Sequence, residues 1–189
     1  MQNNFCVDVE TLSVESTCVV LSAAIVCFDF ESEFTYQDLL DRALFVKFDA
    51  REQANMGRHV SKSTLDFWKE QSPEVRALAI NKHPSDVSAV DGLAQIKEYI
   101  AKHGGSNTYF WQRGTLDSTS LESLCRSVGV EAITNYNNWM DVRTAIRLTK
   151  ETSNTRGYCK VPGFDPIVVD KHHPVPDVAY DVMMLRYGI

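Results

Sequence analysis

Two carboxylates near the start of the chain are the first residues whose types and spacing suggest chemistry. Asp8 and Glu10 lie two residues apart in the apolar segment NNFCVDVETLSV. In a strand, alternate side chains share a face, so the Cα atoms of these acids would lie about 6.6 Å apart. Carboxylates that close repel each other, and a bound Mg²⁺ or Mn²⁺ would relieve the repulsion. The alternative is a solvated strand face opposite a lysine or arginine, and the pair alone favours that alternative.

Further acids and two histidines later in the chain strengthen the interpretation as a metal site. Asp117 follows an expected strand and opens an expected helix, a position where a first-turn acid is also common. His172 and His173 precede a proline-containing segment that leads to Asp177 and Asp181, one helical turn apart. Loop surface and helix-face charge would explain each residue separately. The order of the whole set is harder to explain in that way.

This ordered set resembles the active-site motifs of the DEDDh-type 3′→5′ exonucleases of the ribonuclease-H-like superfamily. The first family motif, D-x-E followed by Thr, is similar to VDVETL, which contains Asp8 and Glu10. The second motif resembles the surroundings of Asp117. The third, a histidine, four residues and an aspartate, resembles His172 and Asp177. The segments GRHVSKSTLDFWKEQS and FWQRGTLDSTSLESLC are similar to the phage exonuclease A subgroup and its bacterial exoribonuclease relatives.

The resemblance implies hydrolysis of phosphodiesters with two divalent metal ions, Mg²⁺ or Mn²⁺, and release of 5′-mononucleotides. The implied metal ligands are Asp8, Glu10, Asp117 and Asp177. His172 would be the general base, because an imidazole with a pKa near ~6.5 accepts a proton close to neutral pH. His173 lies one residue closer to the last aspartate and stays open as a substitute.

The resemblance also implies a pocket for the 3′ end of a strand, lined by Thr11 and Leu12. Leu12 fits the core equally well. Arg113 would meet a phosphate or neutralise the acids. The implied substrate is single-stranded DNA, and RNA is the alternative because no residue in the sequence reveals how the 2′ position is treated. A non-catalytic nucleic-acid-binding module is disfavoured by the complete acid–histidine set, and a ribonuclease-H-like endonuclease is disfavoured by His172.

The pattern of apolar residues places these side chains on an alternating set of strands and helices. Strands are expected at 4–9, 18–30, 43–48 and 107–112. Helices are expected at 61–71, 72–80, 85–104, 116–129 and 138–150, and a last helix after Pro174 and Pro176. Short links between the first three strands favour antiparallel pairing. The expected fold is α/β, a ribonuclease-H-like (DnaQ-like) mixed sheet of three antiparallel strands plus parallel strands, flanked by helices. Residues 151–170 are expected to form a loop or flap.

Composition limits the remaining possibilities. The chain has 189 residues, which suits a single exonuclease domain over 1–189, and a net charge of -6, which excludes a broadly basic nucleic-acid coat. Its five cysteines are scattered without a CxxC pair, so reduced thiols in a cytoplasmic protein are expected, in the host cytoplasm if the gene is phage-encoded. No apolar run is long enough to span a membrane. The oligomeric state stays open, a homodimer included.

Overall fold

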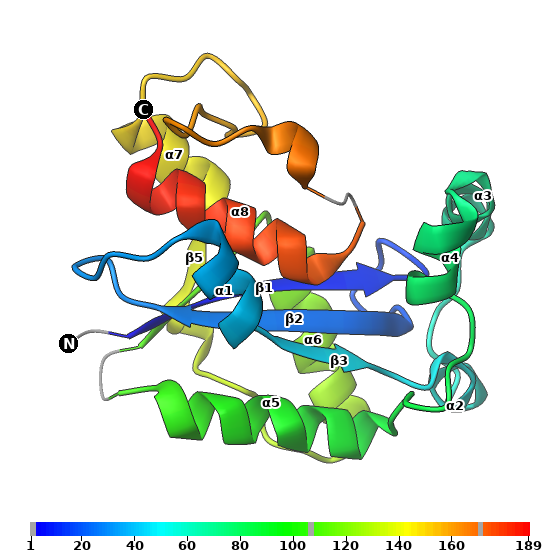
Figure 1. Cartoon of the computed structure of the whole chain (residues 1–189). Helices are drawn as coiled ribbons and strands as arrows, with labels where there is room; N and C mark the ends of the chain where they lie inside the picture. The colour runs from blue at the N-terminus through cyan, green and yellow to red at the C-terminus, as the bar shows by residue number, and fades with distance from the viewer. Residues whose placement is uncertain (1–2, 106–107, 170–171) are drawn as a thin grey trace.

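The computed structural model describes residues 3–105, 108–169 and 172–189, and its centre is a mixed five-stranded sheet in the order β3-β2-β1-β4-β5 (Figure 1). The strands are β1 (Asn4–Thr11), β2 (Val20–Phe28), β3 (Leu44–Lys47), β4 (Tyr109–Gln112) and β5 (Trp139–Asp141). β1, β2 and β3 pair antiparallel, whereas β4 and β5 run parallel to β1. This confirms the predicted sheet of three antiparallel strands extended by parallel ones.

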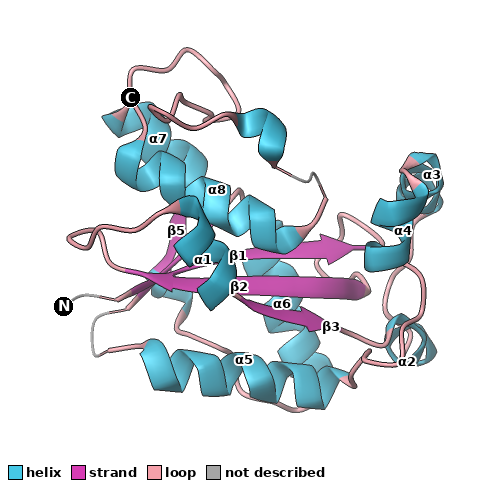
Figure 2. Ribbon diagram, in the orientation of Figure 1, coloured by secondary structure: helices cyan, strands magenta, loops and turns pink. Residues whose placement is uncertain are grey.

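Helices cover both faces of this sheet (Figure 2). One face carries α8 (Pro174–Tyr187), flanked by α1 (Tyr36–Arg42) and α7 (Val142–Thr149). The other face carries α5 (Ala89–His103) and α6 (Leu116–Ser127). Three shorter helices lie beyond the carboxyl ends of β1 and β3: α2 (Ala50–Asn55), α3 (Lys62–Glu70) and α4 (Pro73–Ala79). Within the described residues, no helix is long and apolar enough to cross a membrane.

The alternation of side chains along β1 decides which layer each residue meets. Phe5, Val7 and Val9 are buried in the core cluster formed with α5 and α6. Cys6 is buried in the cluster formed with α8. Because alternate residues of a strand share a face, the acids at positions 8 and 10 follow Cys6 on the α8 side. The sequence pattern of β1 therefore directs both carboxylates towards the helix that carries the last predicted acid.

Local capping explains where the predicted helices begin. The hydroxyl of Ser61 accepts from the N–H of Thr64 at the start of α3, and Ser72 with Pro73 opens α4 in the same way. The helix expected at 85–104 begins later, at Ala89. The reason is that Val87 exchanges backbone hydrogen bonds with the end of β3, which keeps it extended.

Other differences concern short elements. Two helices, α1 and α2, and the strand β5 were not predicted from the sequence. Residues 139–141, expected in a helix, form β5 because they pair with β4, and a three-residue strand is too short to show its own periodicity. The last helix begins at Pro174, so both prolines lie in its first turn. Asn107, the expected start of β4, and residue 170 of the expected flap lie outside the described residues. The rest of the flap has one 3₁₀ turn, Pro166–Val168.

Candidate active site

Three of the predicted metal ligands meet at the carboxyl end of β1. Asp8, Glu10 and Asp177 each offer one carboxylate oxygen, and these oxygens all lie within 4.8 Å of one another. The first two come from β1 and the third from the first turn of α8. Each side chain is partly buried. Residues almost the whole chain length apart thus form one compact set of oxygen ligands.

The fourth predicted ligand, Asp117, is held next to this set by the backbone of β1. Its Oδ1 atom accepts a hydrogen bond of 3.2 Å from the N–H of Val9, the residue between the two strand acids. Asp117 lies in the first turn of α6 and is buried, with 4% of its surface exposed. The strand β1 therefore contains two acids of the site, Asp8 and Glu10, and its main chain positions a third, Asp117.

The charges of these acids are poorly compensated by the protein itself. Burial raises the pKa of Glu10 from 4.5 to about 8, and repulsion from Asp177 and Asp117 adds to the rise. Burial also raises the pKa of Asp8 well above its ordinary range, followed by repulsion from Asp117 and Glu10. For Asp117, burial raises the pKa to about 7 although the Val9 N–H works against it. A hard divalent cation is bound by this kind of oxygen set and would remove the repulsion, so the residues fit a metal site.

In the part of the chain that the structure describes, positive side chains do not fulfil this role for Asp8, Glu10 and Asp117. Among the described residues, no lysine or arginine forms an ion pair with Asp8, Glu10 or Asp117. A largely buried ion pair joins Arg113 to Asp181, which lies one turn after Asp177 on α8. A solvated face neutralised by a basic residue, the alternative for the strand pair, does not describe this surface.

A pocket of about 340 Å³ opens beside the acids. Its walls come from β1 and the turn that follows, from α3, from the start of α6 and from the residue before α8's N-cap. They consist of Val9, Glu10, Thr11, Val14, Ser63, Thr64, Phe67, Trp68, Leu116 and His172. Thr11 was predicted for such a pocket. Phe67 of α3 is 39% exposed and forms part of the wall. The sequence does not reveal the exposure of Phe67, because Phe67 and Trp68 are adjacent aromatic residues and only the structure shows that Trp68 takes the buried position.

The two histidines occupy different surroundings. The ring of His172 lies in the pocket, 5.1 Å from the ring of Phe67 and 6.1 Å from that of Trp68. Its backbone φ of 64° is in the left-handed region, which non-glycine residues adopt rarely and at some cost. His173 caps α8, its Nδ1 accepting from the N–H of Val175 at 3.2 Å, and its ring stacks on Phe45.

The remaining predicted binding residues are placed as follows. Leu12 is 9% exposed and packs in a core cluster with Trp68, so the structure places it in the core. The hydroxyl of Thr11 donates to the carbonyl of Ser13 at 2.7 Å. Arg113 directs its guanidinium to Asp181 and to main-chain carbonyls within the protein. A phosphate contact for Arg113 stays a prediction.

Trp68 fixes the turn that shapes the pocket. The indole Nε1 of this fully buried residue donates to the carbonyl of Thr11 at 3.0 Å. We expect Trp68→Phe to lower the free energy of unfolding by about 1–3 kcal/mol, because it leaves a buried carbonyl without that donor. Chemical denaturation measures this, and Phe67→Leu is the matched control on the same helix. An unchanged unfolding free energy for Trp68→Phe would contradict the role of this hydrogen bond.

The raised pKa values predict a pH-dependent stability of the metal-free protein. Between about pH 4.5 and 8, folded Glu10 keeps a proton that the unfolded chain has released. The stabilisation is complete below pH 4.5 and is lost as the pH rises through 8. In EDTA, the unfolding free energy should therefore fall from pH 5 to pH 8, and less steeply in Glu10→Gln. Mg²⁺ should stabilise more at pH 8 than at pH 5, since it competes with protons. Equal slopes for both proteins would contradict the assignment.

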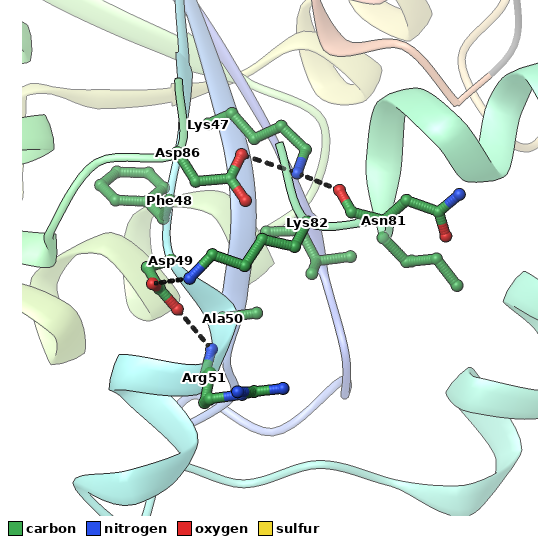
Figure 3. Close-up of a pocket in the computed structure, with 10 residues that line it drawn as sticks. Lys47, Phe48, Asp49, Ala50, Arg51, Asn81, Lys82 and Asp86 are labelled. Atoms are coloured by element: carbon green, nitrogen blue, oxygen red, sulfur yellow. Dashed lines mark hydrogen bonds and ion pairs between the residues drawn. The ribbon is translucent and has the colours of Figure 1, made fainter. Parts of the chain in front are cut away.

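A second pocket of about 340 Å³ lies between β3, α2 and the segment after α4 (Figure 3). Ion pairs cross it: Lys47 Nζ reaches Asp86 at 2.9 Å and the carbonyl of Asn81 at 2.7 Å, and Lys82 Nζ reaches Asp49 at 3.0 Å. These partners satisfy one another, and the pocket is lined by residues other than the predicted site residues. The acid cluster and its adjoining pocket are therefore the candidate active site.

Comparison with known sequences agrees with this geometry. The family model described as "3′-5′ exoribonuclease Rv2179c-like domain" matches residues 3–188. An exodeoxyribonuclease of Enterobacteria phage T4 is 31% identical in an alignment 211 residues long, gaps included. The alignment covers 98% of this chain and 88% of that protein. Both similarities extend over nearly the whole chain.

Two solved exonuclease structures have a similar fold. The nuclease domain of 3′hExo, a DEDDh family member bound to rAMP, has a TM-score of 0.60 at 12% identity, covering 98% of this chain and 90% of that one. Exonuclease I has a TM-score of 0.59 at 12% identity, covering 98% of this chain and 40% of that one. At these identities the likeness concerns the fold, and it confirms the ribonuclease-H-like class predicted from the sequence.

Proposed function

Since the chain belongs to the Rv2179c-like 3′–5′ exoribonuclease family and is a 3′–5′ exonuclease, we propose that it shortens single-stranded DNA from the 3′ end. We further propose that it does so with two divalent metal ions, Mg²⁺ or Mn²⁺, held by Asp8, Glu10, Asp117 and Asp177. The observation that supports this most strongly is the set of three carboxylate oxygens within 4.8 Å of one another. The activity would belong in a bacterial host cytoplasm, as the phage relative suggests.

The reaction is the attack of water on the last phosphodiester. A bond from phosphorus to the water oxygen forms, the bond to the 3′ oxygen of the preceding nucleotide breaks, and a 5′-mononucleotide leaves. Divalent ions held by Asp8, Glu10, Asp117 and Asp177 would lower the pKa of water and stabilise the charge on the leaving oxygen. His172 would take the proton from the water as general base, from its position in the same pocket as Glu10. His173 is less suited because its Nδ1 caps α8.

The pocket beside the acids would hold the terminal nucleotide. Phe67 and Leu116 offer apolar contacts for a base, and Thr11 places a polar group close to Glu10. Stacking on a partly exposed aromatic ring tolerates any base, which suits an enzyme that must remove each nucleotide in turn. Leu12 supports this pocket from the core rather than lining it.

The sugar preference is the open part of the proposal. DNA is supported by the 31% identical phage relative, which is an exodeoxyribonuclease. RNA is supported by the family description, which names an exoribonuclease. The two substrates differ at the 2′ hydroxyl, so the decision depends on groups near the terminal ribose.

Matched oligonucleotides decide between these substrates. DNA and RNA strands of one sequence, labelled at the 5′ end, are incubated with Mg²⁺ or Mn²⁺, alone and annealed to a complement. We expect a ladder of 5′-labelled products from single-stranded DNA at a rate well above that from RNA or duplex. A faster ladder from RNA would make the enzyme an exoribonuclease. Cleavage of a circular strand, or the absence of any ladder, would contradict the exonuclease mechanism proposed for this site.

A further inference from the structure

We infer that Arg113 and Asp181 form a buried positioning pair, which holds Asp117 and Asp177 in place relative to β1. The inference rests on the proposed two-metal function. Arg113 lies four residues before Asp117, and Asp181 lies four residues after Asp177. The pair therefore connects the segment that carries one proposed metal ligand to the helix that carries another.

The contact is a bidentate ion pair removed from solvent. Nε of Arg113 donates to both carboxylate oxygens of Asp181, at 3.1 and 3.2 Å, and Nη2 donates to Oδ1. The two side chains are only 12% and 11% exposed. A planar guanidinium that meets a carboxylate through several bonds fixes orientation as well as distance, and burial reduces screening by salt. This geometry suits a positioning role better than a flexible surface contact would.

The other face of the guanidinium engages the segment before α8. Nη1 of Arg113 donates to the carbonyls of Arg156 and Gly157 at 2.8 and 3.2 Å, and the ring of Tyr158 lies 4.2 Å from the guanidinium carbon. Gly157 has a φ of 69°, and a Cβ there would lie 2.5 Å from the Cα of Arg143 in α7. One arginine thus joins the loop after β4, the helix α8 and the segment packed against α7.

These contacts argue against a direct role in binding substrate or metal. Each nitrogen of Arg113 donates to the protein, so a phosphate would have to displace a buried carboxylate. Among the described residues, the candidate group of three acids within 4.8 Å includes Asp177 but not Asp181. A shift of α8 would move Asp177 away from Asp8, and small misplacements of such groups have large effects on rate.

The experiment compares Mn²⁺ dependence in variants of the pair. The variants are Arg113→Lys, which keeps the charge but loses the fork, Asp181→Asn, and the double variant. We expect each single variant to raise the Mn²⁺ concentration for half-maximal activity by about 10–100-fold, as for other residues that orient metal ligands. Calorimetric Mn²⁺ affinity should fall by the same factor. The KM for the oligonucleotide at saturating Mn²⁺ should change by less than about twofold. The Mn²⁺ affinity of the double variant should be no lower than that of the single variant with the lower affinity, because both substitutions remove the same interaction.

The matched control is Glu33→Gln, which removes an exposed ion pair with Arg186 at the other end of α8. It should leave the Mn²⁺ dependence unchanged. Unchanged Mn²⁺ affinity in Arg113→Lys, or a raised KM with normal Mn²⁺ affinity, would overturn the inference; the second result would make Arg113 a phosphate ligand. If Asp181→Asn does not fold, Arg113→Lys decides alone. A wild-type protein that binds no Mn²⁺ would instead contradict the proposed function.

Discussion

Replacing Asp8 with asparagine is expected to abolish turnover while leaving the protein folded. The substitution removes a carboxylate from the centre of the acid cluster at nearly constant volume. Metal ions at such sites supply several kcal/mol of transition-state stabilisation, and each 1.4 kcal/mol is a factor of ten in rate. We therefore expect kcat to fall at least about a thousandfold in the ladder assay with saturating Mg²⁺.

The same substitution should stabilise the metal-free protein. In the absence of a cation, burial and the neighbouring acids hold the pKa of Asp8 well above its ordinary range, so its ionised form is unfavourable in the folded state. The melting temperature of Asp8→Asn in EDTA at pH 8 should exceed that of the wild type. Addition of Mg²⁺ should stabilise the wild type and have little effect on the variant. An unfolded Asp8→Asn would show that the carboxylate is structural, and normal turnover would show that it is not needed for catalysis.

Replacing His172 with asparagine is expected to lower kcat by about 10²–10⁴-fold, the usual contribution of a general base. Asparagine is the appropriate replacement because it tolerates the positive φ of 64° at this position, so the backbone is preserved. The ladder assay over pH 5–9 measures the effect. The loss of activity towards acid pH should be less steep in the variant than in the wild type, because in the variant only the competition between protons and metal at the acid cluster remains.

His173→Ala is the matched control for this prediction. Its side chain caps α8, so its loss should cost about 0.5–2 kcal/mol of stability, as for other helix caps. Its turnover at a temperature where it is folded should stay close to that of the wild type. The reverse result, a large loss of kcat in His173→Ala and a small one in His172→Asn, would assign the general base to His173.

The part of the site carried by β1 was predictable because a strand has a period of two. Alternation alone placed Asp8 and Glu10 on one side, and the buried Val7 and Val9 show the other side of the same strand. Predicting that Asp177 approaches Asp8 and Glu10 required the ordered set of motifs, because no local sequence pattern indicates that α8 packs on β1. The resemblance to DEDDh exonucleases supplied that information, and the comparisons confirm the family.

Other features depend on tertiary contacts that leave no local signal. The bond from the Val9 N–H to Asp117 joins residues 108 positions apart. Leu12 and Phe67 are both apolar, and only packing against α3 and the core decides that the first is buried and the second exposed. Arg113 was expected to meet a phosphate or to neutralise the acids, and its partner Asp181 was explained as a helix-face charge. Its burial between α8 and the preceding segment could not be inferred from spacing.

The most direct test of the central claim is a crystal structure of the protein soaked in Mn²⁺, with anomalous scattering used to locate the ions. We expect two anomalous peaks at the carboxyl end of β1, with ligand oxygens from Asp8, Glu10 and Asp177, and loss of both peaks in Asp8→Asn. Crystals of active protein with no Mn²⁺ at this cluster, or with Mn²⁺ bound only elsewhere, would contradict the assignment of these acids as the metal site.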